Sequence, residues 1–270
     1  MLMWYINQMK KKICLVLGSG GSKGLAHLGV IKALVEAKFE ITQIVGTSAG
    51  AMIGGLYAAN PNIKEIEDIV YSLSYRKLSK IIFERPGKSA LIQGKNYHNF
   101  IAKICAVKMI EDTKIPFKAV TCDLISGNKF VFTRGPIATA ICASSAIPAI
   151  FSPVEYEEKL LIDGGAIDPV PVDEVESIEN QPIVAVALYK KMFPKNLTKL
   201  KNASFARIAF DSMQVAICNM SKKAIKKADL AILPEVEDIN VLDFVKAKKY
   251  VEIGYEAMKA KIDQLNELVS

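Results

Sequence analysis

Histidine is nearly absent from this sequence. The 270 residues contain only His27 and His98, which is too few for a histidine-rich metal centre. A mechanism in which histidine activates a serine has only these two side chains available. His27 follows a glycine-rich turn, where we expect it to order the loop, and His98 lies in a polar segment far from any motif, where we expect a surface residue. We expect neither a metal nor a cofactor.

Long apolar runs and paired cysteines are also missing. No segment approaches the ~20 apolar residues that a membrane-spanning helix requires. The five cysteines are scattered, without a C-x-x-C pair, which indicates reduced, buried thiols. The first residues, MLMWYINQMKKK, place the lysines after the apolar patch, which is the reverse of a signal peptide. We therefore expect a cytoplasmic protein, in which residues 1–12 form an arm that is either flexible or in contact with a membrane.

Positive charge is concentrated in one stretch of the chain. The net charge is +7, and ten basic residues lie between Lys190 and Lys227 against one acid, Asp211. Such a stretch is typical of a solvated helix face, and the alternative is peripheral contact with an anionic membrane. Lysine outnumbers arginine and few aromatic residues are interleaved, which argues against nucleic acid as a partner.

Segments of strand and helix type alternate along the first part of the chain. Short apolar runs at 13–18 and 41–46 are typical of buried parallel strands. Residues 24–38 follow the first run with apolar positions at helical spacing, and residues 48–59 follow the second as an expected helix that stops at Asn60-Pro61. This order predicts βαβ units, a parallel sheet and an α/β fold.

The rest of the chain continues the same pattern without a repeat or a long linker. Helices are expected at 63–73, 97–110, 136–146, 202–228 and 241–269, and strands at 117–124, 129–133, 159–165, 182–189 and 229–234. Residues 125–128, ISGN, predict a hairpin turn. We expect a single domain over 13–270, with the chemical motifs within 13–172 and a helical C-terminal region at 202–269.

The first motif is the glycine-rich turn GSGGSKGLAHLG at 18–29. It fits neither the G-x-G-x-x-G pattern of dinucleotide-binding loops nor the phosphate-binding G-x-x-x-x-G-K-[ST] pattern, because Lys23 occupies the position of the required glycine in both. Backbone N–H groups at Gly20, Gly21 and their neighbours remain as donors to a developing negative charge, as in an oxyanion hole. Alternatively, the glycines only permit a tight turn.

The second motif is GTSAG at 46–50, a G-x-S-x-G pattern between an expected strand and an expected helix. This is the context of a nucleophile elbow, in which glycines allow a sharp turn that exposes the serine hydroxyl. The alternative is that Ser48 caps the helix. The position between strand and helix favours a nucleophile.

The third motif is DGG at 163–165, at the end of an expected apolar strand. We expect Asp163 at the carboxyl edge of the sheet, where ligand sites of α/β proteins gather. Desolvation raises the pKa of a carboxyl group and makes it a better base. Asp163 would serve Ser48 only within hydrogen-bond reach, and the alternative is a plain Asp-Gly turn. In α/β-hydrolases the catalytic residues follow one another along the chain in the order Ser, Asp/Glu, His. Neither histidine of this sequence follows an Asp or Glu late in the chain, so this order is not met.

In this order and spacing, GGSKG at 20–24, GTSAG and DGG resemble the patatin-like phospholipase family. The resemblance covers about 13–172 and implies a three-layer α/β/α fold with a mostly parallel central sheet. It implies a catalytic dyad, with Ser48 as nucleophile and Asp163 as general base, and acyl-ester hydrolysis of phospholipids, lysophospholipids or related lipids without a metal. The oxyanion hole that it implies consists of Gly20, Gly21, Lys23 and Gly24.

Two other functions remain as alternatives. One is a non-catalytic or weakly active lipid- or membrane-binding protein of the same fold, and the other is an esterase that pairs its serine with His27 or His98. Asp168, where the family often has Asn, is assigned no role beyond a turn.

Apolar residues of 63–110 are expected to form a roof over an acyl pocket. They are Leu73, Ile81, Ile82, Phe83 and Leu91.

Overall fold

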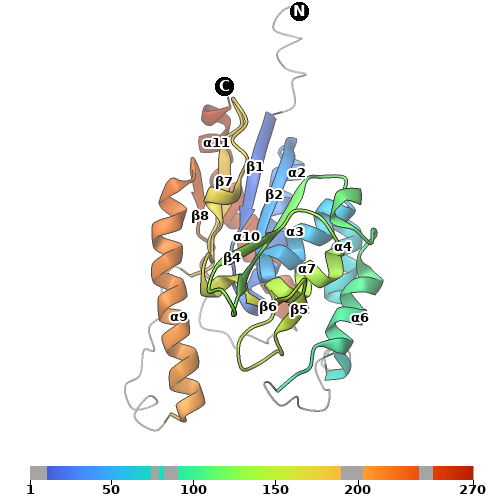
Figure 1. Ribbon diagram of the computed structural model, residues 1–270. Coiled ribbons are helices and arrows are strands. Elements are labelled where there is room, and N and C mark those ends of the chain that lie inside the picture. Colours follow the sequence, from blue (N-terminus) through green and yellow to red (C-terminus); the bar gives the residue numbers. More distant parts are fainter. Residues whose placement is uncertain (1–10, 74–78, 82–90, 190–202, 237–245, 270) are drawn as a thin grey trace, which may run out of the picture.

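A single mixed β-sheet forms the centre of the protein in the computed structural model, which describes residues 11–73, 79–81, 91–189, 203–236 and 246–269. The strand order is β5-β6-β3-β2-β1-β7-β8, and β4 pairs with β3 (Figure 1). The strands are β1 (Lys11–Leu17), β2 (Phe39–Thr47), β3 (Phe117–Asp123), β4 (Lys129–Phe132), β5 (Val154–Tyr156), β6 (Lys159–Asp163), β7 (Ile183–Val186) and β8 (Leu230–Ile232).

The sheet is parallel in its centre and antiparallel at one edge. β1 pairs in parallel with β2 and β7, as do β2 with β3 and β7 with β8. β4 and β6 run antiparallel to β3, and β5 antiparallel to β6. The α/β fold with a mostly parallel sheet and the β3–β4 hairpin are therefore confirmed. The three-residue strand β5 was not predicted, because it is too short to carry a recognisable alternation.

Helices follow the strands much as the periodicity predicts. They are α2 (Ala26–Glu36), α3 (Ala49–Ala59), α4 (Ile63–Tyr71), α6 (Lys95–Ile104), α7 (Ile137–Ser144), α9 (Phe205–Ala224), α10 (Ala247–Lys259) and α11 (Ile262–Leu268). A 3₁₀ turn (Gly21–Leu25) precedes α2, and the expected helix at 241–269 is two helices in its described part. Asn62 begins α4 by accepting a hydrogen bond from the Glu65 N–H, a typical N-cap.

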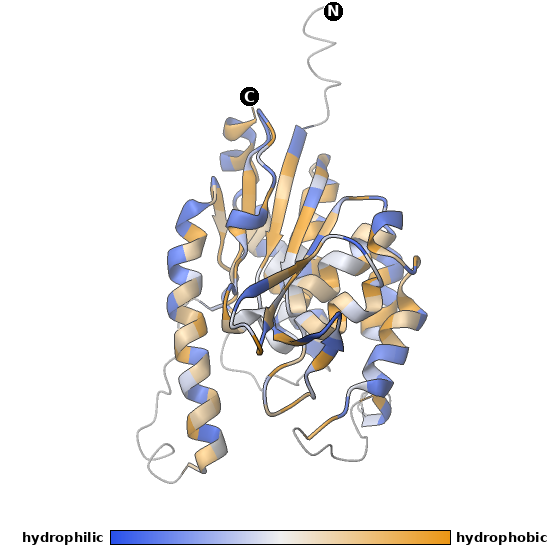
Figure 2. Ribbon diagram, viewed as in Figure 1, coloured by the Kyte–Doolittle hydropathy of each residue, from blue (hydrophilic) through white to orange (hydrophobic). Residues whose placement is uncertain are grey.

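Buried side chains form separate cores on the two faces of the sheet. Along β1, Ile13 and Leu15 join the larger core, whereas Val16 joins a smaller one with Val170 and Ile225. Successive side chains of a strand point to opposite faces, so this division follows from the pleat. Helices α2, α3, α7 and α10 supply most of the larger core. The helices thus flank the sheet, whose central strands are largely hydrophobic (Figure 2).

The expected N-terminal arm falls mostly outside the described residues. Lys11 and Lys12, counted as its last two residues, are instead the first residues of β1. All five cysteines are unpaired, and four of them are buried. In the described part of the chain, no helix has the length and apolar character needed to cross a bilayer.

Candidate active site

Ser48 occupies a sharp turn between β2 and α3. Its backbone angles are φ 57° and ψ −120°, a left-handed conformation that costs a non-glycine residue about 1–3 kcal/mol. Ser48 is the N-cap residue of α3 by position, but its side chain makes no capping hydrogen bond to the helix, so its hydroxyl is not used as a cap. The turn has the backbone geometry of a nucleophile elbow.

Glycines on both sides of Ser48 let strand and helix meet at this turn. A Cβ on Gly46 would lie 2.6 Å from the Ala51 nitrogen, and one on Gly50 would lie 2.0 Å from the Leu17 carbonyl oxygen. Both distances are far inside van der Waals contact with backbone atoms. The two glycines of G-x-S-x-G are therefore required by close packing of α3 against β1 and β2.

Two serines from the end of α7 hold the backbone of Ser48. The Ser48 N–H donates to Ser144 Oγ at 2.8 Å, and Ser144 Oγ donates to the Val120 carbonyl at 2.6 Å. Ser145 Oγ donates to the Ser48 carbonyl at 3.3 Å. These serines had no predicted role, although a Ser-Ser pair directly after an apolar helix was a signal.

Asp163 lies within hydrogen-bond reach of Ser48. Ser48 Oγ donates to Asp163 Oδ2 at 2.6 Å, and the Gly165 N–H donates to Asp163 Oδ1 at 2.7 Å. Burial raises the pKa of the Asp163 carboxyl to about 6, against the opposing effect of these two hydrogen bonds. The carboxylate is thus mostly ionised at neutral pH but more basic than an exposed aspartate.

Asp163 reaches Ser48 from a strand that runs opposite to the parallel strands of the sheet. Its strand β6 runs antiparallel to β3, with Asp163 opposite Thr121, whereas β2 runs parallel to β3 with Thr47 opposite Val120. Asp163 therefore lies one position beyond the end of β2, at the carboxyl edge of the parallel strands, as expected, although its own strand runs in the opposite direction. The reversed strand brings its end back to the middle of β3, next to the end of β2.

Both histidines are engaged away from the Ser48 hydroxyl. His27 is buried, and its Nε2–H donates to the Gly18 carbonyl at 2.7 Å. Burial lowers the pKa of His27 to about 4, so the ring is neutral at physiological pH. His98 lies in α6, where its Nε2 and Thr139 Oγ1 are joined by a 3.2 Å hydrogen bond. The loop-ordering position expected for His27 matches its contact, whereas His98 is half-buried rather than a plain surface residue.

The glycine-rich turn lies against the start of α3. A Cβ on Gly24 would lie 2.2 Å from Ala49 Cβ, so the 3₁₀ turn that begins at Gly21 packs directly beside Ser48. The first N–H groups of a helical turn have no partner within it. The Lys23 side chain is buried, with Nζ 5.8 Å from the centre of the Tyr189 ring. The structure thus brings the glycine turn and the elbow together.

Two hollows meet at Ser48. The larger has a volume of about 90 Å³, and apolar side chains from α3, α4, α6 and the 145–151 segment line it almost entirely. The smaller, about 20 Å³, also contains Asp163 and three side chains of α9. Gly21 and Ile147 belong to both hollows. Another hollow, between β8 and α10, contains none of the motif residues.

The expected roof over the larger hollow is only partly tested. Leu73 and Ile81 line the hollow, whereas Leu91 is 69% exposed and is not among the lining residues. Ile82 and Phe83 lie outside the described residues. Among the residues that are described, no group of three or more His, Cys, Asp or Glu side chains is placed to hold a metal ion.

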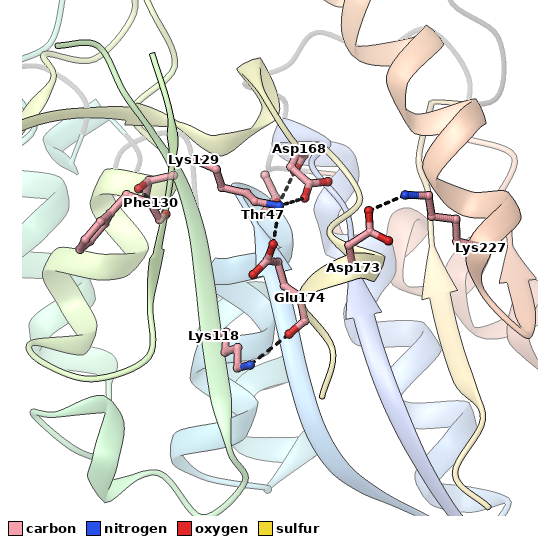
Figure 3. A network of polar contacts seen from close by, with 9 residues as sticks. Thr47, Lys118, Lys129, Phe130, Asp168, Asp173, Glu174 and Lys227 are labelled. Carbon is pink, nitrogen blue, oxygen red and sulfur yellow. Dashed lines mark hydrogen bonds and ion pairs between the residues drawn. The ribbon is translucent and has the colours of Figure 1, made fainter. Parts of the chain in front are cut away.

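Asp168 has more than the turn role assigned to it. Its carboxylate pairs with Lys129 Nζ at 2.9 Å, and its backbone carbonyl accepts a hydrogen bond from Thr47 Oγ1 at 2.9 Å (Figure 3). Lys129 also pairs with Glu174. Sequence spacing gave no sign of this, because the partners come from three distant segments. The network ties the segment after Asp163 to the residue preceding Ser48.

The comparisons with known proteins agree with this geometry. The sequence model described as patatin-like phospholipase matches residues 15–175. The chain belongs to the patatin-like phospholipase family. It is 36% identical over 177 residues to an uncharacterized NTE family protein of Mycobacterium tuberculosis, with 66% of this chain and 49% of that protein covered. It is 27% identical over 285 residues to lysophospholipase nte1 of Neurospora crassa, covering 95% of this chain and 18% of that protein.

The patatin-like chain thus spans about half, or less, of the length of these relatives. Among solved structures, VipD from Legionella pneumophila has a similar fold, with a TM-score of 0.50 and 15% sequence identity. The match covers 94% of this chain and 67% of that structure. At this identity, the likeness extends to the fold alone.

Proposed function

We propose that this protein is a serine acyl hydrolase that cleaves fatty-acyl esters of lipids through a Ser48–Asp163 dyad. The observation that carries the proposal is the 2.6 Å hydrogen bond from Ser48 Oγ to Asp163 Oδ2 at a strained turn. Membership of the patatin-like phospholipase family supports a lipid ester as substrate.

In the proposed reaction, Asp163 Oδ2 takes the Ser48 proton while Oγ attacks the ester carbonyl carbon. The tetrahedral intermediate collapses, the ester C–O bond breaks, and the leaving alcohol receives the proton from Asp163. A water molecule then gives a proton to Asp163 as it attacks the acyl-enzyme. The fatty acid leaves, and the proton returns to Ser48. A carboxylate with a pKa of about 6 suits both directions of this transfer.

The glycine turn is proposed to stabilise the oxyanion of each intermediate. Gly20, Gly21, Lys23 and Gly24 lie in or next to the 3₁₀ turn that packs beside Ser48, and their backbone N–H groups are the proposed donors. Loss of one donor in other acyl-transfer enzymes typically costs about 10²–10³ in rate. The larger hollow is proposed to take the acyl chain, because its lining is apolar and Ser48 lies within it.

Lysophospholipids are the first substrates to test, because the name of the Neurospora crassa relative, lysophospholipase nte1, points to them. Purified protein is expected to release fatty acid from 1-acyl lysophosphatidylcholine and from a short p-nitrophenyl ester. Ser48→Ala and Asp163→Ala are expected to abolish both activities. Full activity of either variant would overturn the dyad.

We further propose peripheral contact of the Lys190–Lys227 region with an anionic membrane. Residues 190–202 lie outside the described part of the chain. In α9, Phe205 is 89% exposed, while Arg207 pairs with Asp211 at 2.7 Å. Binding to anionic vesicles but not to neutral ones, reduced in Phe205→Ser, is the expected result. Equal binding to both vesicles, or none, would leave this region a solvated face.

A further inference from the structure

The smaller hollow beside Ser48 has the size of one water molecule. Its volume is about 20 Å³, and a cavity of about 10–15 Å³ is the smallest that holds a buried water. The alcohol part of a lipid ester is far larger than this space. The hollow therefore suits a single water molecule.

Both members of the proposed dyad line this hollow. Ser48 lines the larger hollow as well, whereas Asp163 is among the described lining residues of the smaller one only. With the acyl chain in the larger hollow, the smaller one lies on the side of the acyl carbon that faces the carboxylate. A water molecule there is next to the base that must take its proton.

Three further polar side chains line the hollow, those of Ser19, Tyr189 and Gln214, and all three are buried. Ser19 and Gln214 each form a hydrogen bond with the Tyr189 side chain, whose pKa burial raises. A serine hydroxyl can take part in three hydrogen bonds and a glutamine amide in four. Both residues therefore keep hydrogen-bonding positions that Tyr189 does not use, and a buried water needs two to four polar partners.

These polar groups converge on Asp163 from two distant segments of the chain. Ser19 Oγ lies 3.3 Å, and Asp163 Oδ1 lies 3.0 Å, from the point that a Cβ on Gly165 would occupy. Ser19 is therefore at the same end of the hollow as the carboxylate. Gln214 enters the hollow from α9, so a water between these side chains is held from more than one side.

We propose that this hollow holds the water that hydrolyses the acyl-enzyme, and that Ser19 and Gln214 are the residues that position it. The inference rests on the proposed acyl hydrolase function. The water oxygen attacks the acyl carbon and gives a proton to Asp163. The bond from this carbon to Ser48 Oγ then breaks, the proton passes from Asp163 to Ser48, and the fatty acid leaves.

The test lets methanol compete with water for the acyl-enzyme formed from p-nitrophenyl butyrate. The ratio of butyric acid to methyl butyrate depends on attack by water, whereas kcat/KM for release of p-nitrophenol depends on acylation alone. In Gln214→Met we expect this ratio to fall by about tenfold, the typical effect of one lost hydrogen bond, with kcat/KM unchanged. Ser19→Ala should lower the ratio in the same way.

Met213→Leu is the matched control, because Met213 lines the same hollow and the substitution removes no hydrogen-bonding group. It should keep the wild-type product ratio. An unchanged ratio in Gln214→Met, whether or not kcat/KM falls, would overturn the inference. An equal shift in Met213→Leu would also overturn it, because the shape of the hollow rather than its hydrogen bonds would then set the ratio.

A crystal structure separates this inference from the proposed function. If the wild type releases no p-nitrophenol, the proposed function fails, and the water site is judged by electron density. A water within hydrogen-bond distance of Asp163 and Gln214 in the wild type, lost in Gln214→Met, would support the site. A hollow without such density in the wild type would overturn it.

Discussion

Ser48 Oγ and Asp163 Oδ2 lie 2.6 Å apart although 115 residues separate them in the chain. The contact joins a strained turn, with Ser48 at φ 57°, to a carboxylate whose pKa burial raises to about 6. A base must be ionised to accept a proton. We therefore expect kcat/KM for a p-nitrophenyl ester to rise with pH along a limb centred near 6. A limb near 4, the range of an exposed aspartate, would show that Asp163 is not the group that titrates.

The same pKa shift links Asp163 to stability. Because the pKa of Asp163 is higher in the folded protein, this carboxyl group contributes to the free energy of unfolding. The contribution is fully present below its pKa in the unfolded chain, about 4, and is lost as the pH rises through about 6. Asp163→Asn removes the buried charge and does not titrate. The free energy of unfolding of this variant, relative to that of the wild type, should therefore increase by roughly 2–3 kcal/mol as the pH rises from about 4 to above 6. Urea unfolding at pH 4 and pH 8 measures this. A pH-independent difference would contradict the buried-charge account.

The two histidines should behave differently from each other and from a catalytic base. His98→Ala should keep wild-type activity, because its ring bonds to Thr139. His27→Ala should lower activity by about tenfold, because the Gly18 carbonyl loses its donor and the glycine turn loosens. His27→Gln, which keeps an N–H donor, should restore part of it. The pH limb near 6 should stay in all three variants, and its disappearance in either histidine variant would favour a Ser–His enzyme.

The Lys129–Asp168 pair should matter more than an exposed pair of the same kind. Asp168→Ala leaves the partly buried Lys129 with Glu174 alone, and we expect it to destabilise the fold by roughly 1–3 kcal/mol. The control is Asp173→Ala, which breaks the exposed pair with Lys227 and should change stability by less than about 1 kcal/mol. Thermal unfolding of both variants provides the comparison. Equal losses of stability in the two variants would mean that the Lys129–Asp168 pair does not stabilise the loop beside Thr47.

Much of the elbow could be predicted from sequence because its determinants are local. Gly46 and Gly50 lie two residues from Ser48, and a glycine at such spacing between strand and helix has few other uses. The apolar run of β2 and the Asn60-Pro61 stop at the end of α3 are local as well. The parallel order of the central strands follows from their alternation with helices.

The remaining features depend on chain pairing that local patterns do not encode. The apolar run of β6 is compatible with either direction, so its antiparallel pairing with β3 was missed. The contacts of Ser144 with Ser48 and of Lys129 with Asp168 join segments separated by 96 and 39 residues.

The central claim is that Ser48 is a nucleophile activated by Asp163 without a histidine. Covalent labelling by a fluorophosphonate, followed by peptide mass spectrometry, tests it most directly. We predict an adduct on Ser48 in wild-type protein, wild-type labelling in His98→Ala, and labelling at least about 100-fold slower in Asp163→Asn, as loss of a general base requires. Labelling of Ser48→Ala at the wild-type rate, or of Asp163→Asn without slowing, would contradict the account.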